Sequence, residues 1–159
     1  RQAVQSRHRT IFSEIGAALA AERAPASARI RMALRRMWEH WQEPGWGHAL
    51  RLMLGEVSTE FPALFRMWAD EGPIQAWKVI RDLVDEGKRS GEFRADVDAD
   101  VAARVLVSGL MLQATLHLHL GLADRAPCDA SRLFDSAGEH FLHGLVVAHA
   151  LPADRTAGR

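Results

Sequence analysis

The chain has 159 residues, of which 48% are hydrophobic and 25% charged, so its size and balance fit one globular domain and not a disordered tail. Its 20 basic and 20 acidic side chains cancel, and this neutrality argues against a nucleic-acid-binding surface, which needs an excess of cations. The single cysteine, Cys128, excludes an internal disulfide and a cysteine-rich zinc site, and it suits a reducing compartment.

The first half of the chain is predicted to form four helices. Apolar residues recur at helical spacing over residues 1 to about 21, which form the first helix. Ser27 is the predicted N-cap of the second helix, whose apolar stripe runs from 30 to 41. A third stripe covers residues 46 to 57, and a short fourth helix opens with Phe61-Pro62, where proline is tolerated in the first turn.

Three further helices are predicted in the second half. Pro73 begins the fifth, because proline at a first helical position loses no needed hydrogen bond, and Gly91 is its C-terminal cap. The acidic run 96–100 caps the next helix, from Val101 to Leu120, which is apolar almost all round and is predicted to be buried on most sides. Asp129 caps the last helix.

These elements predict one all-α domain, a bundle of six or seven helices over residues 1–151 with a flexible tail at 152–159. The most apolar segment, 106–122, is interrupted by one glutamine and two histidines. It therefore falls short of the roughly 20 apolar residues that span a bilayer. We expect no membrane segment and a cytoplasmic location.

The polar residues indicate neither a metal site nor an active site. His117 and His119 are two apart and point to nearly opposite sides of a helix, so they cannot chelate one ion. His140 and His143 share a face but supply only two ligands. Cys128 lies in a Pro-Cys-Asp turn without a nucleophile motif. We expect no metal, no cofactor and no enzymatic activity, and a helical enzyme using His117 has no motif in its support.

The segment that follows the fifth helix carries a family resemblance. Gly91-Glu92-Phe93-Arg94 and the Asp96/Asp98 cap after it resemble the TetR family of transcriptional regulators, in which such a turn precedes a dimerisation helix. Residues 56–68, with their Phe-Pro turn, and 141–145 are similar as well. The resemblance covers nearly the whole chain as the family's fourth to ninth helices. The turn itself is predicted to be structural, with its phenylalanine packed inward.

The resemblance implies the effector-binding and dimerisation domain of a bacterial one-component regulator, with repressor as the expected role. The family's first three helices form the helix-turn-helix that enters the DNA major groove, and they have no counterpart in these residues. Operator DNA would be a partner only through that N-terminal domain. The alternative from another class is a stand-alone helical module that binds a small molecule or dimerises without contacting DNA.

Bulky aromatic and methionine side chains lie on the apolar stripes of four predicted helices. They suit a pocket for a small apolar or aromatic ligand, and the resemblance implies an effector held between these helices. Gln113 and His117 share a face with Leu110, and their polar atoms need partners, either in a ligand or in neighbouring helices. Ordinary core packing is the alternative for the whole set. The predicted ligand-binding residues are Met37, Trp38, Trp41, Met53, Phe65, Trp68, Trp77, Leu110, Gln113 and His117.

Two glycines within the last two helices indicate a close approach of helices, because glycine in a helix costs about 1 kcal/mol relative to alanine. The resemblance implies a symmetric homodimer whose interface is a four-helix arrangement with two helices from each subunit. Packing within one subunit is the alternative. The predicted interface residues are Val105, Gly109, Leu112, Leu116, Phe134, Phe141, Gly144, Leu145 and Ala148.

Overall fold

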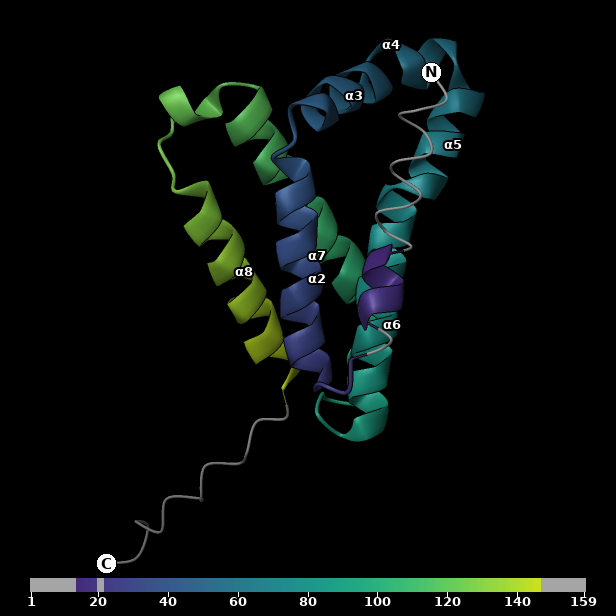
Figure 1. Cartoon of the computed structure of the whole chain (residues 1–159), viewed down its shortest axis with the longest axis vertical. Coiled ribbons are helices and arrows are strands. Elements are labelled where there is room, and N and C mark those ends of the chain that lie inside the picture. Colours follow the sequence, from purple (N-terminus) through teal and green to yellow (C-terminus); the bar gives the residue numbers. More distant parts are fainter. Residues whose placement is uncertain (1–13, 20–21, 147–159) are drawn as a thin grey trace, which may run out of the picture.

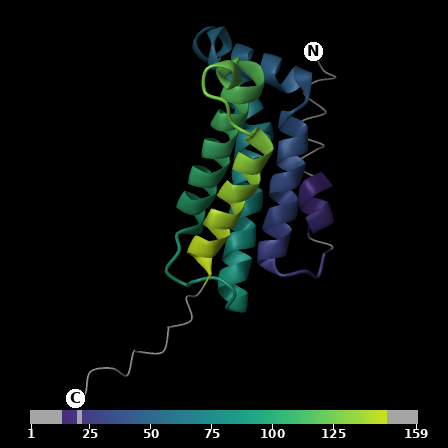
Figure 2. The same cartoon turned by 90° about the vertical axis from the view of Figure 1, so that its left-hand side faces the viewer.

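The computed structural model describes residues 14–19 and 22–146, and every regular element in these ranges is helical, which confirms the all-α class (Figure 1). Residues 14–19 form a helical segment that lies beside the helix Ala26–Trp41 (Figure 2). In chain order the elements after it are α2 (Ala26–Trp41), α3 (Pro44–Leu54), α4 (Glu56–Glu60), α5 (Pro62–Glu71), α6 (Pro73–Ser90), α7 (Ala99–Ala114), the π-helical η1 (Thr115–His119), the short 3-10 helix η2 (Leu122–Asp124) and α8 (Ala130–Leu145).

Four long helices, α2, α6, α7 and α8, run along the length of the molecule, and α2 packs against the other three (Figure 1). Helices α3 and α4 lie across one end of the molecule, and α5 runs down from them to the start of α6; these three helices are called the arch (Figure 1). The core between the long helices is apolar, and Ile30, Ala33 and Met37 of α2 and Ile80 of α6 are fully buried in it. The arch is therefore joined at its two ends to α2 and α6, which pack in one common core.

The predicted helix starts are confirmed where a short acidic side chain or a proline determines them. Asp98 accepts hydrogen bonds from the N–H groups two and three residues later, at 3.0 and 3.1 Å. Asp129 accepts one from the third residue after it, at 3.0 Å. Pro62 and Pro73 are the first residues of α5 and α6.

Two other boundaries differ from the predicted ones. Helix α2 begins at Ala26 with Pro25 at its N-cap, so the prediction of Ser27 as the cap is wrong. The stripe at 46–57 is divided into α3 and α4 at Gly55, whose ψ of −121° departs from helical values. Residues 14–19 are helical as predicted, whereas the rest of the predicted first helix and the tail at 152–159 lie outside the described residues.

The predicted helix at 101–120 consists of two elements. Helix α7 passes at Ala114 into the π-helix η1, in which the N–H of Leu120 donates to the carbonyl of Thr115 at 3.1 Å. A π-helix takes more residues per turn than an α-helix, so it rotates the side chains that follow away from the register of α7.

Helix α7 is also less buried than the sequence predicts. Val105 and Leu112 are 70% and 54% exposed, so one apolar face of α7 is uncovered in the single chain. By length and composition alone, Ala99–His119 is apolar enough to cross a membrane, which the sequence analysis did not expect. The core helix of a soluble protein meets the same criterion, and the other faces of α7 pack against α2, α6 and α8.

A single turn after α6 connects three helices. Gly91 ends α6 in the left-handed region, at a φ of 80°, which glycine adopts without strain. Phe93 folds back to bury its ring against Gly87, and its N–H donates to the Gly87 carbonyl at 3.0 Å. The N–H of Arg94 donates to the carbonyl of Leu145, at the end of α8, at 2.8 Å. The inward packing predicted for this phenylalanine is confirmed.

Glu92 of the same turn caps α2, although the two segments are far apart in sequence. Its carboxylate accepts the N–H groups of Ala26 at 2.8 Å and Ser27 at 3.0 Å. N–H groups in a first helical turn have no acceptor within their own helix, and a negative charge beside them is favourable toward the helix dipole. The turn therefore supplies the cap that the sequence analysis assigned to a serine.

Replacing Glu92 by alanine removes both cap hydrogen bonds of α2. We expect the free energy of unfolding to fall by about 1–2 kcal/mol, the usual loss when helix N–H groups lose their acceptor. A urea titration followed by circular dichroism measures this change. The control is Glu60→Ala, at an exposed position of α4, which should shift the free energy by less than about 0.5 kcal/mol. Equal losses in the two variants would contradict the cap.

Gly87→Ala tests the packing of Phe93 on α6. A methyl group at Gly87 would overlap the Phe93 ring, so the ring must move. We expect a loss of about 1–3 kcal/mol from overpacking, although alanine favours a helix by about 1 kcal/mol over glycine. Gly45→Ala is the control, because a methyl group there meets no atom within 4 Å. If Gly87→Ala raised the urea midpoint, the close approach of Phe93 would be wrong.

Candidate functional site

A small cavity lies where the arch joins the long helices. Its volume of about 10 Å³ leaves room for about one water molecule, whereas ligand sites in proteins occupy about 300–1,000 Å³. The cavity is therefore too small for a ligand in this conformation. It is lined by Trp41 of α2, Trp46 of α3, Trp68 of α5, Gly72, Pro73 and Ala76 of α6, and Val107 and Met111 of α7.

An aromatic cluster surrounds this cavity. The rings of Trp41 and Trp46 lie 5.8 Å apart, and Phe134 of α8 packs edge-on against Trp41 at 5.6 Å. The ring of Phe65 lies 5.8 Å from that of Trp68 within α5. Offset and edge-on contacts of this kind stabilise aromatic pairs beyond the area they bury. The cavity is thus enclosed by rings from both ends of the arch.

The predicted ligand-binding residues divide between the cavity and the core. Trp41 and Trp68, two of the residues predicted to bind a ligand, line the cavity. Met37 and Leu110 are buried in the core, at 0% and 3% exposure. A helical stripe identifies the buried face of a helix, but it does not separate side chains that line a cavity from those that fill the core beside it.

Four other predicted residues lie at the edges of this region. Trp38 packs against Phe134 of α8, with ring centres 4.9 Å apart. Trp77 of α6 is half-buried, and the guanidinium carbon of Arg104 lies 4.8 Å from its ring centre. Met53 and Phe65 are half-buried in the arch. These four are not among the residues that line the cavity.

The structure does not bring the predicted polar pair to the cavity. Val107 and Met111 form the wall that α7 contributes, and Gln113 and His117 lie on another part of the helix. Nδ1 of His117 is 3.1 Å from the backbone carbonyl of Gln113, so the histidine finds a partner in its own helix. This partner is the local backbone and neither a ligand nor a neighbouring helix, the two alternatives that the sequence offered.

His119 is a structural contact that the sequence analysis missed. Its Nε2 lies 2.9 Å from the carbonyl of Trp41, and its ring centre is 5.7 Å from that of Trp46. A Cβ at Gly47 would overlap the imidazole, so a glycine is needed beneath it. The π-helix brings His119 to this position, and α-helical periodicity could not have shown it. Trp46 and Met111 were also missed as cavity residues, although both lie on apolar segments.

The predicted dimer interface contains both uncovered and buried residues. Val105 and Leu112 of α7 are exposed, and Leu116 is half-buried. A methyl group at Gly109 of α7 or Gly144 of α8 would meet no atom within 4 Å. These residues leave an open surface that a second subunit could cover.

Other residues of the predicted interface belong to the subunit itself. Phe134 and Leu145 are 3% and 4% exposed in the single chain, because this face of α8 packs into the core beside α2. They are therefore not available to a second subunit in this conformation. Phe141 is half-buried and packs against the core, whereas Ala148 lies outside the described residues.

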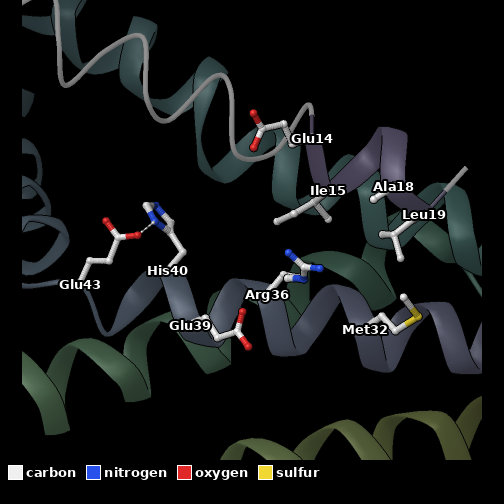
Figure 3. A pocket seen from close by; sticks show the side chains of 9 residues that line it. All are labelled: Glu14, Ile15, Ala18, Leu19, Met32, Arg36, Glu39, His40 and Glu43. Carbon is white, nitrogen blue, oxygen red and sulfur yellow. Dashed lines mark hydrogen bonds and ion pairs between the residues drawn. The ribbon is translucent and has the colours of Figure 1, made fainter. Parts of the chain in front are cut away.

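A second pocket, of about 330 Å³, lies between residues 14–19 and α2 (Figure 3). Ile15, Leu19 and Met32 give it an apolar side, and charged side chains of α2 lie around the rest. Arg36 points from α2 toward residues 14–19, and His40 faces Glu43, with Nδ1 and Oε1 3.4 Å apart. This surface groove was not predicted, and its charged walls differ from the apolar cavity under the arch.

The resolved pKa shifts lie at the surface. The hydrogen bond from Arg31 of α2 lowers the pKa of the Glu139 carboxyl of α8, and the same bond raises the pKa of Arg31. This pair stabilises the contact between α2 and α8 above the ordinary glutamate pKa of 4.5, and the contribution is lost as the pH falls through the lowered pKa. Solvent screens such an exposed pair, so its contribution is small. Among the described residues, no three acidic, histidine or cysteine side chains are placed to hold a metal.

Residues 28–143 match the family of the AefR-like transcriptional repressor, C-terminal domain. Comparisons with curated proteins and with solved structures gave no match. The matched segment runs from the start of α2 to the last turn of α8 and includes the Gly91–Arg94 turn and the aromatic cavity. It covers most of the chain, and the chain therefore belongs to the TetR family, as an AefR-like C-terminal domain.

Proposed function

We propose that the chain is the effector-binding and dimerisation domain of a bacterial, cytoplasmic transcriptional repressor, in which a small apolar effector changes the affinity for operator DNA. Its membership of an AefR-like C-terminal domain family supports this proposal, and the uncovered apolar face of α7 is the observation that carries it. DNA binding belongs to an N-terminal helix-turn-helix that these residues do not include.

The homodimer forms through α7 and α8. The uncovered face of α7 carries Val101, Val105 and Leu112, at 55%, 70% and 54% exposure, with Gly109 open among them. Burying such side chains is favourable by about 25 cal/mol for each Å² of apolar surface. A two-fold axis beside α7 would bring the same face of a second copy onto it. Each exposed apolar residue would then contact apolar residues of the identical patch on the second subunit. Helix α8 packs against α7, and on it Phe141 is half-buried and Gly144 is exposed.

The effector occupies the cavity under the arch. The three tryptophans of the lining, Trp41, Trp46 and Trp68, offer flat apolar surfaces from three different helices. Because the cavity has room for only about one water molecule, an effector must separate these helices in order to bind. A ligand that favours the separated arrangement shifts the population toward it, with a coupling of typically about 1–3 kcal/mol.

The movement reaches the N-terminal side of the chain through α6. The first residues of α6 line the cavity, and near its other end Glu86 pairs with the guanidinium of Arg29. Arg29 is 7% exposed and also donates to the carbonyl of Glu22 at 3.3 Å, in the segment that leads into α2. A shift of α6 would therefore move Arg29 and, through its hydrogen bond to Glu22, the helical segment 14–19 that precedes Glu22.

The dimer is tested by light scattering at micromolar concentration. The chain should show a mass of twice 17.6 kDa. Leu112→Glu should give a monomer that keeps the helical circular dichroism spectrum of the parent chain, because the side chain is exposed in the single subunit and only the second copy is repelled. The matched control is Leu52→Glu, a 46% exposed leucine of the arch, which should remain dimeric. A monomeric parent chain, or a dimeric Leu112→Glu variant, would disprove this interface.

The regulatory role is tested on the coding DNA upstream of the Arg1 codon. We expect an in-frame segment of about 50 residues that forms three helices with basic residues near the third, as a helix-turn-helix requires. The protein including that segment should bind its own promoter region and should lose affinity by about 5- to 150-fold with the effector. A start codon at that position would favour the stand-alone ligand-binding module instead.

A further inference from the structure

We infer that the cavity under the arch takes a flat, uncharged aromatic ligand, and that the ligand enters by displacing Trp68 as α5 swings away from the long helices. This inference rests on the proposed effector site and specifies both the class of ligand and the route by which it binds. In this arrangement the side chain of Trp68 blocks the cavity, and α5 is the helix that moves to open it.

The charge of the ligand follows from the lining. All eight lining residues are apolar, aromatic or glycine, and none carries a charged group. Moving a charge from water into such surroundings is strongly unfavourable without a partner. The groove between residues 14–19 and α2 is the opposite case, since Glu14, Arg36 and Glu39 surround it. A charged aromatic compound should therefore avoid the cavity and, if it binds at all, prefer the groove.

The shape of the ligand follows from the rings around the cavity. Trp41 and Trp46 are tilted 38° to each other at 5.8 Å and are held by the core, at 2% and 6% exposure. Trp68 faces them from α5 and is only half-buried. An aromatic ring system of about the size of an indole would fill the space that Trp68 leaves and could pack against the tilted rings of Trp41 and Trp46.

Helix α5 is the least anchored wall of the cavity. None of its residues is buried, whereas α2 and α6 each bury several side chains in the core. Phe65, the aromatic neighbour of Trp68, belongs to α5 itself and moves with it. Local opening requires least free energy where few apolar side chains are buried, so α5 should open before the helices on either side of it.

Two glycines flank the segment that moves. Gly55 precedes α4 and Gly72 follows α5, and their ψ values of −121° and −92° both interrupt the helical path. Hinges are a few residues at the ends of elements that absorb changes in φ and ψ. Gly72 itself lines the cavity, next to Pro73 at the rigid start of α6. Rotation about these two points withdraws Trp68, and the ligand that takes its place then contacts the start of α6, which also lines the cavity.

Naphthol and naphthalenesulfonate test the class of ligand, because they share one ring system and differ in charge. Both are titrated calorimetrically into the whole chain. Naphthol should bind at least about tenfold more tightly than naphthalenesulfonate, a difference of one decade in Kd. Equal affinities, or tighter binding of the sulfonate, would overturn the inference of an uncharged ligand in this cavity.

Trp68→Ala tests the gate in stopped-flow mixing with naphthol. Association should be at least about tenfold faster than in the parent chain, because no plug has to leave. Trp68→Phe, which keeps the fold with a smaller ring, should be intermediate. Phe61→Ala is the control, because this 62% exposed aromatic residue precedes α5 but does not line the cavity. It should leave the rate unchanged.

Unchanged rates in both Trp68 variants, or equal acceleration by Phe61→Ala, would overturn the gate. Amide hydrogen exchange adds a measurement that needs no variant: α5 should exchange faster than α6 in the free chain and slower once naphthol is bound. If naphthol binds neither the parent chain nor Trp68→Ala, the inference fails, and the light-scattering test of the dimer still decides that part of the proposed function independently.

Discussion

The Gly91–Arg94 turn holds three helices through main-chain contacts, and the arrangement of the long helices depends on it. The left-handed Gly91 ends α6, the carboxylate of Glu92 caps α2, and the N–H of Arg94 bonds to the last residue of α8. Phe93 fills the space that Gly87 leaves open on α6. Four consecutive residues thus fix the ends of three helices, and this explains why the turn was recognisable in the sequence although it contacts no ligand.

Local rules predicted most helix ends, and contacts distant in sequence determined the rest. Asp98 and Asp129 cap the helices that follow them because the bond is made within three residues. The start of α2 could not be predicted in this way, because Glu92 lies 66 residues from Ala26, whose N–H it accepts. A local serine looked sufficient, but the helix begins two residues earlier than a cap at Ser27 would place it, and it takes its cap from another part of the fold.

The sites were harder to predict than the helices, for a geometric reason. An apolar stripe shows that a helix has a buried side, but not which neighbour it faces. Trp41 and Trp38 lie on one predicted stripe, yet Trp41 lines the cavity and Trp38 packs toward α8. In the same way Phe134 was predicted to meet a second subunit and instead fills its own core. The π-helix adds a shift of register that brings His119 to the arch, and no α-helical pattern contains that shift.

Helix α6 runs from the cavity to the Gly91–Arg94 turn, so one helix contributes to the cavity wall and also to the turn. Its 18 residues begin at Pro73, in the cavity wall, and end beside Gly91. Helix α6 buries several side chains in the core and α5 buries none, so the arch should open locally more readily than α6. We therefore propose that a ligand in the cavity acts through α6 on this turn, and through it on the start of α2 and the end of α8. Because α8 packs against α7, the same turn would couple the proposed ligand site to the proposed dimer interface.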